Sequence, residues 1–193
     1  MNKTRVEAFS DGVMAIIITI MVLELKVSHE VDFQALINLF PIFSSYLLSF
    51  IFVGIYWVNH HHLFHTVKHV NGKILWANLG LLFALSLIPF STGWMGENHY
   101  AELPVAVYSA NLLLCGFAAY LLQIAITSGL PKNDKIFEVI KSNMKKTIIS
   151  VTMNVISIAF AFFYPMISLL LNCIMAAIWM IPDKRVETLM EDE

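Results

Sequence analysis

"RVEAFSDGVMAIIITIMVLEL", residues 5–25, begins with polar side chains and continues as an apolar run. The polar positions in its first half are Arg5, Glu7, Ser10 and Asp11. The second half is as hydrophobic as a membrane-spanning helix, although Thr19 interrupts it. A charged side chain inside a membrane needs a partner, because leaving it unpaired is costly. The stretch therefore predicts a spanning helix whose polar start contacts neighbouring helices.

The composition of the chain is that of an integral membrane protein. Of its 193 residues, 58% are hydrophobic and only 13% are charged, and the mean hydropathy is +0.72. Soluble domains carry about 25% charged residues, so this chain has too few polar residues to cover a water-facing surface. A net charge of −2 without a basic run gives no indication of nucleic-acid binding.

Six stretches are candidates for membrane spans, which need about 20 apolar residues each. The charge-free run 147–181 is too long for one crossing, and Pro165 divides it, because the residue before a proline avoids helical geometry. We therefore predict an all-α membrane protein with six transmembrane helices, forming a single domain over residues 1–193. The predicted spans are 5–25, 36–58, 74–95, 103–127, 147–163 and 166–181.

The distribution of charge predicts the orientation in the membrane. With six spans, 11 of the 12 Lys and Arg residues fall on the side of the two termini, and only Lys26 falls on the other. The positive-inside rule then places both termini in the cytoplasm of a multi-pass protein of the cell membrane. The outer loops are acidic, with Glu24, Glu30, Asp32, Glu97 and Glu102. This acidic rim either concentrates cations or is simply a solvated loop surface.

Helical periodicity separates two faces of the first predicted helix. At 100° per residue, one stripe contains Arg5, Phe9, Gly12, Ile16, Thr19, Ile20 and Leu23. Asp11 lies about 140° from Ile16, and Ser10 lies about 120° away on the opposite side. The polar pair therefore faces away from the Ile16 stripe, toward neighbouring helices.

Partners for this polar pair stand at the end of the second predicted span. The sequence there is "YWVNHHHLFHTVKH", residues 56–69, at the same cytoplasmic level as Asp11. Its donors are Trp57, Asn59, His60 and His61, and Asn78 lies at this level in the third span. Hydrogen bonds from such donors would keep the Asp11 carboxylate charged.

Arg-x-x-x-Phe-Ser-Asp at Arg5, Phe9, Ser10 and Asp11, followed by an Ile-rich helix, resembles the signature of the transmembrane protein 175 potassium channel family. The Trp-x-x-His-His pattern at Trp57, His60 and His61 also fits, and the resemblance covers nearly the whole chain. Animal members carry two such repeats. A chain with one repeat resembles the bacterial members, which assemble as homotetramers.

The resemblance implies a potassium-preferring channel for monovalent cations in a lipid bilayer. The sequence lacks a Thr-Val-Gly-Tyr-Gly filter, as the family does. The first helix of each subunit would line a central pore, with Ile16 as the hydrophobic constriction and Thr19, Ile20 and Leu23 in adjacent layers. Ile16 and Thr19 would govern ion selectivity, and Ile16, Ile20 and Leu23 would form the gate. The expected structural network comprises Arg5, Phe9, Ser10, Asp11, Trp57, His60, His61 and Asn78. Potassium is the permeant ion, and no enzymatic activity, cofactor or resident metal is implied.

Other interpretations of the same residues remain open. An Ile/Leu stripe on a membrane helix often faces lipid or another helix, and a lone Thr often bonds to its own backbone. A secondary transporter would need a polar site near the midplane, for which only Thr19, Ser44, Ser45, Ser49 and a few amides are available.

Histidines suggest one more alternative. His61, His65 and His69 share a face if the second helix continues into the cytoplasm, and this spacing can bind zinc or nickel. The His60–His69 cluster would then mark a metal-binding membrane protein.

Overall fold

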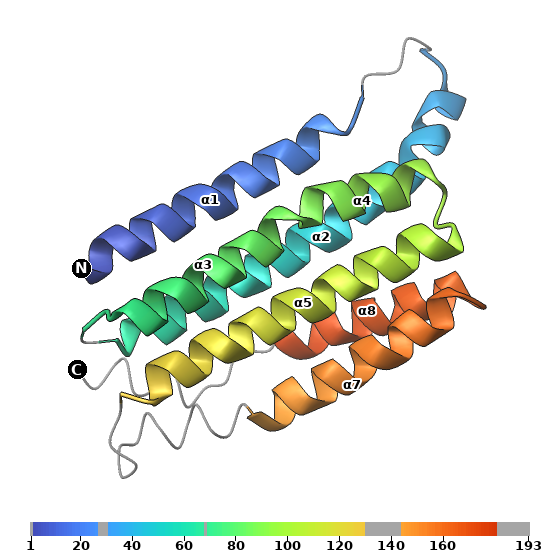
Figure 1. Cartoon of the computed structure of the whole chain (residues 1–193). Helices are drawn as coiled ribbons and strands as arrows, with labels where there is room; N and C mark the ends of the chain where they lie inside the picture. Colours follow the sequence, from blue (N-terminus) through green and yellow to red (C-terminus); the bar gives the residue numbers. More distant parts are fainter. Residues whose placement is uncertain (1, 27–30, 68, 130–143, 181–193) are drawn as a thin grey trace.

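The computed structural model describes residues 2–26, 31–67, 69–129 and 144–180, and in these ranges every regular element is a helix. The elements are α1 (Lys3–Leu23), α2 (Phe33–His65), α3 (Gly72–Ser86), α4 (Ile88–Glu97), α5 (Glu102–Thr127), α7 (Met144–Ala161) and α8 (Pro165–Met180). They run alongside one another as an elongated bundle (Figure 1). The predicted all-α membrane fold is confirmed.

Side-chain caps fix where three of these helices begin. Asn2 accepts a hydrogen bond from the backbone N–H of Thr4 at the start of α1, and Asp32 accepts one from Ala35 at the start of α2. Asn71 caps α3 in the same way, through the N–H of Ile74. Asn and Asp are favoured at this position because their oxygens satisfy backbone donors that the first turn leaves unpaired.

The third predicted span consists of two helices in series. Leu87 ends α3 and precedes α4, and Pro89 occupies the first turn of α4. A proline has no backbone N–H and is tolerated in the first turn of a helix, so the chain restarts there without losing a hydrogen bond. Together the two helices form the 26-residue apolar segment Gly72–Glu97.

Length and hydropathy divide the helical segments into two groups. Among the described residues, four segments are long and apolar enough to cross a membrane: α1, α2, the combined α3–α4 and α5. The last two, α7 and α8, are shorter apolar helices. Pro165 is the first residue of α8, so the proline separates two helices as the sequence predicts.

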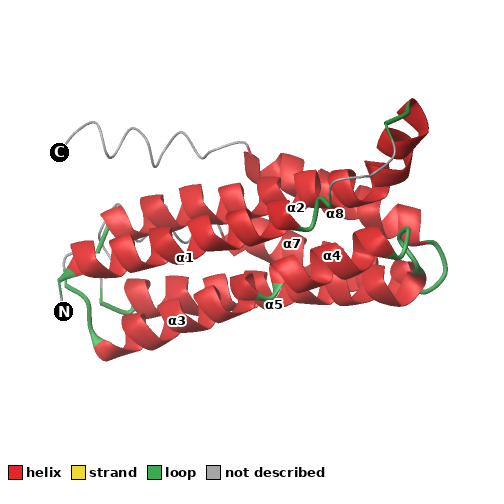
Figure 2. Cartoon of the chain, turned by 90° about the horizontal axis from the view of Figure 1, so that it is seen from above, coloured by secondary structure: helices red, strands yellow, loops and turns green. Residues whose placement is uncertain are grey.

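Helix α2 is longer than its predicted span, because it begins at Phe33 and continues to His65; Pro41 lies within it. Its first turns bend away from the bundle (Figure 2). The turn between α4 and α5 packs onto the helix at the proline: Tyr100 donates a 2.9 Å hydrogen bond to the carbonyl of Pro41. His99 and Tyr100 both have positive φ, 48° and 61°, which makes this turn tight.

Packing places α1 at one side of the bundle. It contacts α2, α3 and α4, whereas α7 and α8 pack on the opposite side against α5 (Figure 1). Two apolar clusters form the core, one among α1, α2, α3 and α5 and the other among α2, α4, α5, α7 and α8. One side of α1 is therefore held by the rest of the chain, and the other side is open.

Candidate functional site

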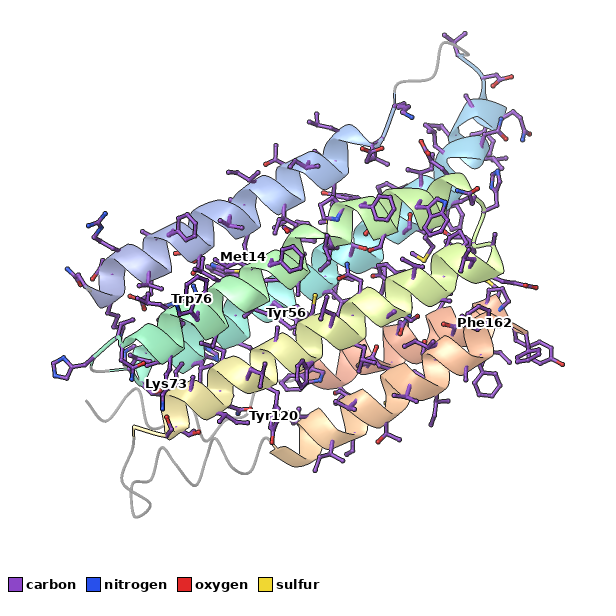
Figure 3. All side chains as sticks on the ribbon, viewed as in Figure 1. Met14, Tyr56, Lys73, Trp76, Tyr120 and Phe162 are labelled. Carbon is purple, nitrogen blue, oxygen red and sulfur yellow. The ribbon has the colours of Figure 1, made fainter. Side chains whose placement is uncertain are left out.

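The two faces of α1 differ in burial. One face packs into the bundle through Val6, Ser10, Met14, Ile17 and Met21. Figure 3 shows Met14 on the side of α1 that faces α3 and α2. The opposite face carries Ile16, 59% exposed, and Leu23, 71% exposed, together with Phe9, Thr19 and Ile20. The whole predicted stripe thus lies on the face that a single chain leaves uncovered.

A buried chain of hydrogen bonds ties α1 to α3 and α2. The Ser10 hydroxyl donates to the carbonyl of Val6 at 2.8 Å and accepts from Nδ2 of Asn78 at 3.0 Å. Oδ1 of Asn78 accepts from Nε2 of His60 at 2.8 Å. All three side chains are almost fully buried. Asn78 therefore stands between a side chain of α1 and one of α2.

Asp11 is anchored separately, at the exposed edge of α2. Nε1 of Trp57 donates a 3.0 Å hydrogen bond to its carboxylate, and the Trp57 ring stacks on His61. The expectation that Ser10 and Asp11 share partners is thus only partly right. His60 bonds Asn78, whereas Trp57 bonds Asp11, so Ser10 is linked to α2 only through Asn78 and Asp11 is linked to α2 directly.

The structure places the other predicted network members outside these bonds. Arg5 and Phe9 lie on the exposed side of α1. Asn59, which the sequence offers as a donor, bonds to the carbonyl of Ile55 in its own helix.

Two contacts at the ends of α1 involve residues that sequence reasoning missed. Lys3 donates to the carbonyl of His65 at 3.1 Å, which joins the start of α1 to the end of α2. At the other end, Nζ of Lys26 lies 2.8 Å from a carboxylate oxygen of Glu97. This exposed ion pair raises the pKa of Lys26, through the hydrogen bond and the negative charge of Glu97. The only signal in the sequence was that Lys26 is the lone base among acidic outer loops.

Thr19 presents an oxygen rather than a free hydroxyl proton. Its Oγ1 donates to the carbonyl of Ala15 at 2.9 Å, the back-bond common for Thr in membrane helices. The hydroxyl oxygen keeps its acceptor capacity, and the residue is exposed.

The histidine cluster does not form the continuous face that a metal site would use. Helix α2 ends at His65, Thr66 caps it, and His69 follows outside the helix. Across the residues that the structure describes, no group of three or more His, Cys, Asp or Glu side chains is placed to hold a metal ion.

Polar side chains in the middle of the bundle bond to one another. Ser49 pairs with Thr92 at 2.7 Å and with the Tyr108 hydroxyl at 3.1 Å. A second buried cluster joins α5, α7 and α8 through Ser109, Ser157, Ser168 and Asn172. Such bonds stabilise helix packing in membranes. Because these hydroxyl and amide groups already bond to one another, a transporter site built from them is disfavoured.

Comparison with known proteins agrees with this geometry. The profile of the family "Endosomal/lysosomal potassium channel TMEM175" matches residues 5–89, which include α1 and its anchor. A potassium channel of Chryseobacterium sp. (strain P1-3) is 51% identical over 192 residues, covering all of both chains. The bovine endosomal/lysosomal proton channel TMEM175 is 34% identical over 99 residues, which span 45% of this chain and 20% of the relative.

A solved structure is also similar. The crystal structure of a lysosomal potassium-selective channel TMEM175 homolog from Chamaesiphon minutus superposes with a TM-score of 0.81 at 26% identity, covering 92% of this chain and 96% of that one. These proteins are channels and not enzymes, and the apolar helices described above are those of a multi-pass membrane protein. The chain belongs to the TMEM175 family of potassium channels.

Proposed function

We propose that the chain is a potassium-preferring cation channel in which α1 of each of four identical subunits lines a central pore. One observation carries this proposal: α1 is packed by its own subunit on one face and exposes Ile16, Ile20 and Leu23 on the other. A single bundle of this size has no room for an aqueous path, so a pore on a symmetry axis requires a closed ring of copies.

Ile16 forms the constriction in this proposal. Four isoleucine side chains around an axis make a narrow apolar ring, which excludes water and therefore ions that keep their hydration shell. Ile16 has no side-chain oxygen to replace that shell. Thr19, one turn further along the exposed face, offers the nearest hydroxyl oxygen, and this position supports a role in cation preference.

The buried network supports the pore by fixing the rotation of α1. Ser10 is held by Asn78 and Asp11 by Trp57, on two sides of the helix. With both bonds in place, the Ile16 face can point only away from the subunit. Ser10 and Asp11 therefore position the pore lining and do not themselves contact the ion.

Electrical recording tests this proposal. Purified wild-type protein in planar bilayers should give single-channel steps, and its reversal potential in a potassium–sodium gradient should lie closer to the potassium value. A flux that saturates without unitary steps would indicate a transporter. The same recording is made in a proton gradient, because the animal relatives are named proton channels.

A further inference from the structure

Two stripes of aromatic side chains remain uncovered on the sides of α1. On α2, Phe50 and Trp57 stand seven residues apart, and on α3–α4 the residues Trp76, Phe83 and Phe90 repeat at the same interval. Each side chain is at least 43% exposed. A seven-residue interval keeps side chains on one side of a helix and is typical of long helix–helix contacts.

The two stripes flank the proposed pore face on opposite sides. On α2, Trp57 lies at the edge that meets α1, where it bonds Asp11. On α4, Phe90 lies about 60° around the axis from Gly93, which faces Glu24 at the end of α1. In the opposite direction around the α4 axis, Phe90 lies about 100° from Ser91, whose hydroxyl accepts a hydrogen bond from Asn111 of α5. In a ring of copies with α1 innermost, the α2 side of one copy meets the α3–α4 side of the next.

Depth in the membrane decides which residues can meet. Rotation about an axis normal to the membrane leaves depth unchanged, so residues in contact across the ring must lie at the same level. Two internal hydrogen bonds calibrate these levels: His60 lies level with Asn78, and Ser49 lies level with Thr92. The 11 residues from 49 to 60 on α2 thus correspond to the 14 residues from 78 to 92 on α3–α4.

This calibration aligns the stripes. Phe50, next to Ser49, falls at the level of Phe90, and Trp57 falls at about residue 82, beside Phe83. Gly96 packs against Ser45 and Ile42, so the correspondence between α2 and α4 continues toward the outer ends of these helices. Aromatic side chains therefore face one another at two levels if the α2 side of one copy docks on the α3–α4 side of another.

The outer helices present a different surface. Exposed side chains along α7 and α8 are aliphatic over most of their length: Ile148, Ile149, Val155, Ile156, Ile167, Leu170 and Ile174. This is the composition expected against lipid tails. Exposed aromatic residues at heptad spacing lie on α2, where Phe43 precedes Phe50 and Trp57 and where Phe33 and Phe40 form a second pair in the first turns, and on α3–α4. The described parts of α7 and α8 carry none at this spacing, which favours a protein partner on the sides next to α1.

We propose that the α2 stripe of one copy packs against the α3–α4 stripe of the next, with Phe50 against Phe90 and Trp57 against Phe83. The contact is heterologous, so it repeats from copy to copy and forms a closed ring when all α1 helices face one axis. The proposal rests on the pore function above, since it assumes that α1 faces the axis. Edge-to-face or offset aromatic pairs would add specificity to the apolar contact.

Disulfide cross-linking between differently tagged chains tests the proposal. One chain carries Phe50→Cys and the other Phe90→Cys, both with Cys173→Ser to remove the exposed thiol; Cys115 is buried and is kept. After co-expression and oxidation in membranes, we expect a covalent dimer that contains both tags. Either chain alone should give none, because a heterologous contact never places Phe50 against Phe50. The pair Trp57→Cys with Phe83→Cys is the second matched pair; because Trp57→Cys also removes the bond to Asp11, this pair is scored only on the tetramer fraction separated by native gel.

A mismatched pair controls for random collision. Phe50→Cys with Trp76→Cys uses the same two stripes at different depths and should not cross-link. If the protein is tetrameric by native mass spectrometry but neither matched pair cross-links, the proposed contact is wrong while the pore proposal stands. Equal cross-linking of matched and mismatched pairs also contradicts the contact. A monomer under all conditions contradicts the pore proposal itself.

Discussion

Nδ2 of Asn78 donates a 3.0 Å hydrogen bond to the hydroxyl of Ser10, and through this bond α3 holds the rotation of α1. The bond is buried, and Asn78 uses its other amide atom to accept from His60. A single side chain thus serves two helices. Ser10 in turn faces the interior, so the Ile16 stripe faces outward.

Replacement of Asn78 by Leu should destabilise the protein strongly. Leu has a similar volume but no polar atoms, so the variant leaves the Ser10 hydroxyl and the His60 ring without their buried partner. We expect a loss of about 1–3 kcal/mol for each unsatisfied group, seen as a lower melting temperature in detergent. Asn59→Leu is the matched control, because Asn59 bonds only its own helix. An Asn78→Leu variant that melts like the wild type would show that this network does not hold α1.

The Trp57–Asp11 bond should matter for assembly more than for ion preference. Trp57→Phe removes the indole donor, whereas Asp11→Asn keeps an oxygen that still accepts from Trp57. We therefore expect Trp57→Phe to reduce the tetramer fraction on native gels more than Asp11→Asn does, with the potassium-to-sodium permeability ratio nearly unchanged in both. A variant that stays tetrameric but loses potassium preference would place Asp11 on the ion path.

Gly96 should tolerate no side chain. A Cβ at this position would lie 2.9 Å from the Cα of Ile42 and even closer to the Ser45 hydroxyl. Gly96→Ala should force α4 away from α2 and cost about 1–3 kcal/mol, read as a lower melting temperature. Gly80→Ala is the control, since its Cβ would meet nothing within 4 Å. Equal melting of the two variants would contradict the close packing of α2 on α4.

The orientation of the protein in the membrane is predicted from its basic residues, and cysteine labelling tests it directly. In the Cys173→Ser background, a cysteine at Asn98 should react with an impermeant reagent added outside intact cells. A cysteine at Ser128, at the far end of α5, should react only after the membrane is opened. The reverse pattern would place both termini outside.

Much of this architecture is predictable because membrane helices can be recognised from the length and hydropathy of their sequences. The break at Pro165 follows from proline geometry, and the grouping of Ile16, Thr19, Ile20 and Leu23 on one face follows from the helical period. What the sequence leaves undetermined is the rotation and register between helices. Asn78 is recognisable as lying at the right depth, but its position between Ser10 and His60 depends on how three helices pack.

Other features had no local signal. Lys26 meets Glu97 only because the ends of α1 and α4 converge. The Ser109, Ser157, Ser168 and Asn172 cluster uses small residues that look unremarkable in an apolar run, and three helices must come together before they form a network.

Potassium and sodium flux into liposomes, for wild type and for Ile16→Asn, tests the pore constriction most directly. Asn is polar and close to Ile in size, so it should wet the ring, raise resting flux and weaken the preference for potassium. Thr19→Val should instead lower potassium preference without raising resting flux. Ile124→Asn, on the exposed side of α5, is the control for leak caused by a polar residue in any span. If Ile16→Asn is folded and tetrameric but its resting flux equals that of the wild type, Ile16 does not close the pore.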